Sequence, residues 1–321
     1  MWLKQLRRRW LGNPSSPGRG GAGRHHPRGR PGVERLEERA VPTTFPTVAS
    51  GDVTTLRADL LVAATDHTAD VINLAANGTY DLTDALPTAA GPSGLVVTGT
   101  ANVTINGNGS TIVRDGAAAP FRLWFIDSGT TVVMNSLTLT DGEVAGAGTA
   151  AQGAGLFDNG ARLTLTGVTV KNDFAVGNHG DAATKGRGFD AQGGGLYANG
   201  GNLTLNNSSF LHDAAAGGDG TTTGAGAGAA GGNAQGGGAY VSGATLTVTN
   251  SIFGAAATNA PNFAAGGAGR FGGTPSRGGD GGSGQGGGLY ALNSNVTISG
   301  SFLGNGVNSN LFSNVAAGGT G

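Results

Sequence analysis

The stretch Gln192-Gly193-Gly194-Gly195-Leu196-Tyr197 decides the fold, because close copies of it recur along the second half of the chain. Each copy is followed, without a gap, by apolar residues at fixed positions, as Leu203, Leu205 and Phe210 follow this one. Self-similarity in a fixed register is the mark of a stacked solenoid. The other copies are Gln152-Gly153-Ala154-Gly155-Leu156-Phe157, Gln235-Gly236-Gly237-Gly238-Ala239-Tyr240 and Gln285-Gly286-Gly287-Gly288-Leu289-Tyr290.

Alignment of the copies predicts ladders of like residues in successive coils. An aliphatic residue recurs at one position of each copy, so Leu can stack on Leu, and each buried side chain stabilises the fold by roughly 1.5–3 kcal/mol. Neighbouring coils would lie about 4.8 Å apart, the spacing of paired strands. The predicted ladders are an amide row (Gln152, Gln192, Gln235, Gln285), an aromatic row (Phe157, Tyr197, Tyr240, Tyr290) and an aliphatic row (Leu165, Leu205, Val248, Ile298).

Composition points to an all-β chain. The sequence has 64 glycines in 321 residues, and glycine costs roughly 1 kcal/mol against alanine inside a helix. No strict Gly-X-Y period occurs, which excludes collagen, and the absence of cysteine excludes disulfides and thiolate sites. From Asp70 onward, short runs of alternating apolar residues end at Gly, Asn or Asp, as strands in tight bends do.

A short helix is expected before the first strand. Ser50 or Asp52 can cap it, and Leu56, Leu60 and Leu61 would form its apolar side. A solenoid needs its open end covered, and an amphipathic helix can do so. We therefore predict one β-solenoid domain over residues 46–321, with a repeat-bearing half over 152–321.

The repeats are too long for bare coils, and the excess residues lie in one place. Three Gly/Ala/Asp-rich segments, 175–191, 214–234 and 254–284, separate the last strand of one copy from the next Gln-Gly. We expect them to project as long loops from one edge of the solenoid. Because closure entropy grows slowly with length, we also expect them to be dispensable for folding.

The phrases ADVINLAANGTYDLT (69–83), LTLTGVTV (163–170), LTLNNSSF (203–210) and LTVTNSIF (246–253) resemble those of the right-handed parallel β-helix, the pectin-lyase-like superfamily. The nearest variety is the polymorphic, adhesin-like exported type, and the resemblance covers residues 68–321. It implies a right-handed solenoid. It implies little about function, because the superfamily holds lyases, hydrolases and adhesins.

Residues 1–45 are expected to be a disordered basic leader. They carry ten Lys/Arg against three Glu, whereas the remainder has a net charge of −8. Within the leader, residues 30–42 resemble the R-P-x-x-E-x-L-E-x-R-x-x-P motif of planctomycete extracytoplasmic proteins, which implies export to an extracytoplasmic location. The acidic remainder of the chain does not extend the basic surface of the leader, so no nucleic-acid partner is expected. The sequence also contains no apolar run of about 18 residues, so no membrane span is predicted.

Two of the ladders have a functional interpretation and a structural one. The glutamines could form a sugar-binding row, but side-chain amides in parallel solenoids also bond to one another, and the amide ladder is the favoured interpretation. The aromatic row could be a stacking platform for sugar rings. Inward-facing core packing is the favoured interpretation for it.

Catalytic chemistry has little support in the sequence. A polysaccharide lyase needs clustered carboxylates for calcium and a base, and a glycosidase needs paired carboxylates. Asp173 and Asp213 are the only acids that match in two coils, and the gapless alignment continues to Ala256 and Gly306. The sequence therefore predicts no catalytic or cofactor site, and Asp173 and Asp213 are the candidates for a calcium ion.

The function that these observations favour is an exported surface or matrix-type structural or adhesive protein. Its partners would be an extracellular polysaccharide or another surface protein. The rival hypothesis is a carbohydrate-active β-helix enzyme. A third hypothesis is a fragment of a larger surface protein, because the chain stops within what resembles the next loop, at 316–321. The last coil would then be open for end-to-end association.

Overall fold

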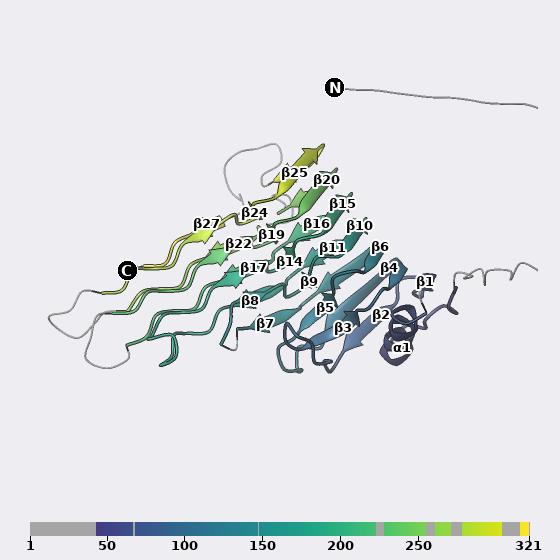
Figure 1. Cartoon of the computed structure of the whole chain (residues 1–321), viewed down its shortest axis with the longest axis horizontal. Coiled ribbons are helices and arrows are strands. Elements are labelled where there is room, and N and C mark those ends of the chain that lie inside the picture. Colours follow the sequence, from purple (N-terminus) through teal and green to yellow (C-terminus); the bar gives the residue numbers. More distant parts are fainter. Residues whose placement is uncertain are drawn as a thin grey trace, which may run out of the picture. The chain divides into compact units, whose positions relative to one another are not determined.

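The computed structural model describes residues 43–66, 68–146, 148–222, 228–254, 261–270, 278–303 and 315–320 (Figure 1). Most of the predicted leader, including the motif at 30–42, lies outside the described residues.

Strands dominate the described residues and form four sheets. The long sheet contains β1 (Ala69–Asn73), β2 (Thr79–Leu82), β4 (Asn102–Arg114), β6 (Thr131–Thr140), β10 (Arg162–Thr166), β15 (Asn202–Asn206), β20 (Thr245–Thr249), β25 (Asn295–Ser299), β11 (Thr169–Lys171), β16 (Ser209–Leu211), β21 (Ile252–Phe253) and β26 (Phe302–Leu303). The aromatic sheet contains β3 (Ser93–Val97), β5 (Arg122–Ile126), β9 (Leu156–Asp158), β14 (Leu196–Asn199), β19 (Ala239–Ser242) and β24 (Leu289–Leu292).

Two smaller sheets complete each coil of the repeat half. The alanine sheet contains β7 (Glu143–Ala145), β12 (Phe174–Val176), β17 (Ala214–Ala216), β22 (Phe263–Ala265) and β27 (Val315–Ala317). The glutamine sheet contains β8 (Ala151–Gln152), β13 (Ala191–Gln192), β18 (Ala234–Gln235) and β23 (Gly284–Gln285).

Successive coils pair in parallel and in the register of the sequence repeat. On the long sheet, Leu203 of β15 lies between Leu163 of β10 and Leu246 of β20. Figure 1 shows the equivalent strands of successive coils side by side. Strand order follows the repeat, from β10 through β15 and β20 to β25. The chain is thus mostly parallel strands in stacked sheets, an arrangement consistent with a β-helix.

The hydrophobic core lies inside the coils and is built from the predicted ladder. Leu165, Leu205 and Val248 are 0% exposed, whereas Ile298 on β25 is 39% exposed. Phe210 and Phe253 stack with ring centroids 4.8 Å apart and planes 4° apart. Inward-facing side chains therefore repeat from coil to coil and touch their own equivalents.

Helix α1 (Val53–Ala63) precedes the first strand, as expected. Asp52 is its N-cap, and the Oδ1 atom accepts a hydrogen bond from Thr55 N at 2.9 Å. Leu56 and Leu60 are buried in the main core, but Leu61 is 67% exposed. The prediction for Leu61 is wrong, because adjacent helical residues point about 100° apart and cannot share one narrow face.

The glycine-rich segments leave the sheets on one side and run alongside one another in successive coils (Figure 1). We call their described parts the glycine layer. It comprises outgoing limbs (177–180, 217–221, 266–270, 318–320) and returning limbs (186–190, 228–233, 278–283).

Backbone hydrogen bonds connect these limbs in a zigzag. Gly218 N donates to Phe189 O at 2.9 Å, Gly232 N to Gly218 O at 2.8 Å, and Gly267 N to Gly232 O at 2.9 Å. Each bond crosses from an outgoing to a returning limb or back. The row continues through Gly282, which donates to Gly267, and Gly319, which donates to Gly282.

The outgoing limbs have a period of three residues. Gly217 N donates to Ala265 O and Gly220 N to Ala268 O, both in the next coil at 2.8 Å. The residue between them, Gly218, donates in another direction, to the preceding returning limb. Three residues per turn in an extended backbone is the geometry of polyproline II. The expected long loops on one edge are therefore present, and their described limbs have a regular, repeating backbone.

Glycine is required in this layer because the limbs are in direct backbone contact. A Cβ atom on Gly218 would collide with Asn178 O, and one on Gly232 would collide with Phe189 O. No side chain fits between the limbs at these positions. The described limbs are thus packed against one another, which argues against the expectation that the segments are dispensable for folding.

Candidate functional site

The four repeat glutamines lie next to one another in the glutamine sheet and form a chain of side-chain hydrogen bonds. Gln152 Nε2 donates to Gln192 Oε1 at 2.8 Å, Gln192 Nε2 to Gln235 Oε1 at 2.9 Å, and Gln235 Nε2 to Gln285 Oε1 at 2.9 Å. The amides thus bind each other, which is the geometry of a structural ladder. Gln152 is the first member of the ladder among the described residues, and Tyr197 lies within hydrogen-bond reach of its side chain.

The aromatic row stacks along the aromatic sheet. Ring centroids of Phe157 and Tyr197 are 4.9 Å apart, those of Tyr197 and Tyr240 5.2 Å, and those of Tyr240 and Tyr290 5.5 Å. Phe125 on β5 extends the row, 5.7 Å from Phe157. Each ring face is therefore turned mainly to another ring, and the row does not present free faces along its length for sugar stacking.

The aromatic row lies on the opposite face of its sheet from the main core. Leu196 and Ala198 belong to the main core, whereas Tyr197 between them belongs to a separate cluster with Phe157 and Tyr240. Side chains alternate across a strand, so the rings point away from the coil interior. The favoured interpretation of an inward-facing row differs from the structure.

These outward rings are nevertheless covered. Phe157, Tyr197 and Tyr240 are only 5–8% exposed. Burial raises the pKa of Tyr197, and a hydrogen bond from Gln152 acts in the opposite direction. The amide row therefore packs beside the aromatic row and covers part of it.

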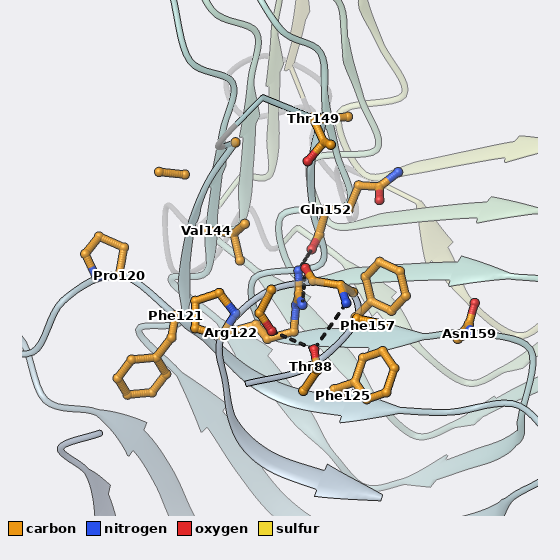
Figure 2. Close-up of a pocket in the computed structure, with 17 residues that line it drawn as sticks. Thr88, Pro120, Phe121, Arg122, Phe125, Val144, Thr149, Gln152, Phe157 and Asn159 are labelled. Atoms are coloured by element: carbon orange, nitrogen blue, oxygen red, sulfur yellow. Dashed lines mark hydrogen bonds between the residues drawn. The ribbon is translucent and has the colours of Figure 1, made fainter. Parts of the chain in front are cut away.

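A pocket of about 600 Å³ lies where the aromatic row meets the start of the repeat half. Phe125 and Phe157 line one side and the segment 88–92 before β3 another, and the remaining lining includes residues 144–146 at the end of β7, Thr149 and Ala150. Figure 2 shows Arg122 between Thr88, Gln152 and Phe157, with Thr149 on the far side of Gln152. The volume suits a small organic ligand.

Arg122 is the most unusual residue of this pocket. It is 2% exposed, and among the described residues it has no carboxylate partner. Nη1 donates to Ala90 O at 2.7 Å, Nη2 to Gln152 O at 3.1 Å and Nε to Gly153 O at 3.4 Å. The guanidinium carbon lies 4.9 Å from the centre of the Phe157 ring. Burial lowers the pKa of Arg122 to about 10, so the side chain stays cationic at neutral pH.

Asp173 and Asp213, the candidates for calcium, are both 0% exposed. Gly142 N donates to Asp173 Oδ1, and Asp173 N donates to Asp213 Oδ1 at 3.1 Å. Calcium takes six to eight oxygen ligands, and two enclosed carboxylates that each bind a backbone N–H do not supply such a set. Burial raises the pKa of both groups well above the usual value, and the negative charge of Asp173 raises that of Asp213 further.

The next member of this polar row is Asn262, not Ala256. Asp213 N donates to Asn262 Oδ1 at 2.9 Å, and Asn262 Nδ2 donates to Phe210 O at 2.9 Å. The gapless alignment fails here because extra residues follow β21. Ala256 and Gly306 lie outside the described residues. Asn262 shows how a neutral side chain satisfies this position, since it accepts with one atom and donates with the other.

Asp158 is also enclosed. It shares a strand position with Ala198 of β14, and both are 0% exposed. Its Oδ1 accepts from Ala161 N at 2.7 Å and Gly160 N at 3.0 Å, so the carboxylate caps the turn after β9. Burial raises the pKa of Asp158 to about 7, although these backbone hydrogen bonds act in the opposite direction.

Within the described residues, no group of three or more His, Asp or Glu side chains is placed to hold a metal ion. The described part of the chain also contains no helix with the length and apolarity needed to cross a membrane.

The sequence analysis missed Arg122, Phe125 and Asn262. A signal existed for the first two, because a single arginine stands in the otherwise apolar run Phe121–Ile126. That coil lacks the Gln-Gly motif, so it did not align with the repeats.

The chain matches no protein-family model, no curated protein and no solved structure with which it was compared.

Proposed function

We propose that this protein is an exported structural or adhesive solenoid, a right-handed parallel β-helix of the pectin-lyase-like type that binds extracellular polysaccharide without cleaving it. The fold argument rests on the stacked parallel sheets and on the sequence resemblance over residues 68–321. The export argument rests on the motif at 30–42.

The observation that carries the non-enzymatic part of the proposal is the position of the acids. Asp158, Asp173 and Asp213 are 0% exposed. Lyases and glycosidases of this architecture act through carboxylates that reach the substrate or its metal ion. These three carboxylates bind backbone N–H groups instead.

Other described acids of the repeat half also have structural partners. Asp190 forms an ion pair with Arg187 at 3.2 Å, and Asp219 lies 3.6 Å from His179. Asp181 accepts from Thr184 N at 2.9 Å. These pairings support a scaffold in which carboxylates hold turns and limbs.

The test compares binding with turnover on the same polysaccharides. Full-length protein is incubated with pectate, alginate and neutral glucans, with calcium present, and the bound fraction and the release of unsaturated or reducing ends are measured. We expect retention on at least one polymer and no new chain ends. Calcium-dependent cleavage that is lost in Asp173→Asn would overturn the proposal in favour of the enzyme.

Export is tested separately. A chain that begins at Ser50 should fold but remain inside the producing cell, because it lacks the motif at 30–42. Export of that chain at the full-length level would contradict the targeting role of the leader.

End-to-end association of two copies is part of this proposal. Leu292, Val296 and Ile298 are each 39% exposed and Leu303 is 50% exposed. Among the described residues, no strand pairs with the outer edges of β25 and β26, and such an apolar edge favours contact with a second copy. We expect the apparent mass to rise with concentration and Ile298→Asp to abolish that rise. A mass that does not depend on concentration contradicts the association.

A further inference from the structure

We infer that the pocket beside Arg122 binds an acidic sugar unit, with the sugar carboxylate against the Arg122 guanidinium and the sugar ring against Gln152 and the edges of Phe125 and Phe157, whose faces are stacked within the aromatic row. This inference rests on the proposed polysaccharide partner and specifies where and how the polymer is held.

The first argument is charge. Arg122 is a cation with 2% exposure, and the described residues provide no carboxylate to neutralise it. Elsewhere in the described residues, Arg114, which is also buried, does have a carboxylate partner, Glu143 at 2.8 Å. A buried charge that lacks a counterion is costly. An anionic ligand in the adjoining pocket would supply the missing charge.

The second argument is the number of donors. A guanidinium has five N–H donors. Those of Arg122 reach Ala90 O, Gln152 O and Gly153 O, and Ser93 Oγ lies at 3.5 Å. One donor on Nη2 therefore has no acceptor among the described residues. Hydrogen bonds between a guanidinium and a carboxylate are roughly twice as strong as neutral ones.

The third argument identifies the ligand as a sugar rather than a bare anion. Aromatic rings line the pocket beside polar side chains, among them Thr88, Gln152 and Asn159. Gln152 is the first amide of the ladder and also lines the pocket, so a ligand hydroxyl in the pocket would meet its side chain. Apolar rings with a few convergent polar groups are the usual composition of a small-ligand site, and a sugar ring presents both C–H faces and hydroxyls.

The fourth argument is position. The pocket lies at one end of the aromatic row, beside the end of β7 and beside Thr149 and Ala150, which precede the glutamine sheet. Figure 2 shows the labelled side chains of Arg122, Gln152 and Phe157 gathered around one space. At about 600 Å³ it has room for one or two sugar units of a longer chain.

The test measures binding of monosaccharides to the full-length protein by calorimetry or NMR. The probes are D-glucuronate, D-glucose and acetate at equal ionic strength. We expect glucuronate to bind about tenfold or more tightly than glucose, since a charged hydrogen bond is added. Glucuronate should also bind more tightly than acetate, because only the sugar contacts the rings and the amide.

Variants place the site. Arg122→Met should remove the preference for glucuronate over glucose. Arg122 also binds three backbone carbonyls, so its replacement risks misfolding, and Thr149→Trp serves as the second variant. Thr149 is exposed at the pocket, and tryptophan there should block binding about tenfold or more. The matched control is Thr245→Trp on the exposed side of β20, which should bind like the wild type.

Several outcomes would overturn the inference: equal affinity for glucuronate and glucose, equal affinity for glucuronate and acetate, stronger binding of an acidic peptide than of glucuronate, or unchanged binding in Thr149→Trp. If the wild type is retained on a polysaccharide and Thr149→Trp is retained equally well, the pocket assignment is overturned. The proposed adhesive function would then still stand. Glucuronate binding without retention on any polymer would instead contradict the adhesive function and leave the pocket assignment intact.

Discussion

The interior of the coils and the glycine layer both stack from coil to coil, but the first does so through side chains and the second through backbone atoms. Inside the coils, side chains such as Leu205 and Phe210 fill the space between sheets and are 0% exposed. In the glycine layer, limbs touch backbone to backbone, and a Cβ atom on Gly232 would collide with Phe189 O. The interior is stable because of what its side chains contact, and the glycine layer because the glycines at its contacts have no side chain.

This difference predicts opposite sensitivities to mutation. The coil interior should tolerate changes that conserve apolar volume and fail when volume is removed or charge is added. The glycine layer should fail when a single carbon is added. Hydrogen bonds between limbs replace the hydrophobic contacts of the coil, and each contributes about 0.5–1.5 kcal/mol net.

The largest expected effect is Leu205→Asp. This residue lies between Leu165 and Val248 in the main core, where an unpaired charge has no compensation. We expect loss of the cooperative β-sheet melt measured by circular dichroism. Thr204→Asp is the control, because Thr204 is the half-buried neighbour on the same strand and should cost far less. Equal melts for the two variants would refute the register.

The next effect is Gly232→Ala in the glycine layer. The added Cβ requires adjacent limbs to separate, and we expect destabilisation of about 1–3 kcal/mol or more, the range for overpacking. Gly116→Ala is the matched control, because a Cβ atom there meets nothing within 4 Å. If denaturant melts of both variants match the wild type, the limbs do not pack as described.

A smaller effect, of opposite sign, is expected for Asp213→Asn. Burial raises the folded-state pKa of Asp213 well above its unfolded value of about 4. The protonated form therefore stabilises the fold below about pH 4, and this contribution is lost as pH rises toward the folded pKa. Asparagine cannot ionise and can donate as Asn262 does.

Thermal melts at pH 4 and pH 8 check this prediction. Asp213→Asn should raise the melting temperature at pH 8 and change it little at pH 4. Asp81→Asn on β2 serves as the exposed control and should show no such difference between the two pH values. A lower melting temperature for Asp213→Asn at pH 8 would mean that the buried carboxylate is stabilising in its charged form.

The smallest effect is expected for the amide ladder. Gln192→Ala removes two side-chain hydrogen bonds, which should cost about 1–2 kcal/mol. Gln285→Ala removes the single bond from Gln235 and should cost about half as much. Equal costs would show that the ladder bonds are replaced by water.

Much of the coil could be predicted from the sequence because its contacts repeat. Leu203 pairs with Leu246 across the same offset that joins Gln192 to Gln235, so alignment of the copies places both. The helix cap followed from Asp52 and its neighbours, where a local hydrogen bond decides the start. Leu61 was misplaced because a run of apolar residues does not reveal which of them the helix turns inward.

The rest depended on contacts that leave no side-chain pattern. The partners of Gly218 and Gly232 are backbone atoms of distant segments, and only the recurrence of paired glycines after Ala216, Ala265 and Ala317 hinted at them. Asn262 was missed because an insertion shifts it away from the alignment. Arg122 was missed because its lack of a counterion is a property of the folded neighbourhood and not of the strand that carries it.

The amide ladder also shows how such a chain can vary in length. Gln152, Gln192, Gln235 and Gln285 are 40, 43 and 50 residues apart, yet their side chains meet at nearly constant distance. The extra residues of the longer repeats lie after the last strand of each coil. The length of the glycine-rich segments and the number of stacked coils can therefore change independently. A lineage could lengthen the glycine-rich segment of one repeat, or duplicate a whole repeat, and leave every other coil undisturbed. Gene duplication can therefore change the number of coils without requiring new contacts within each coil.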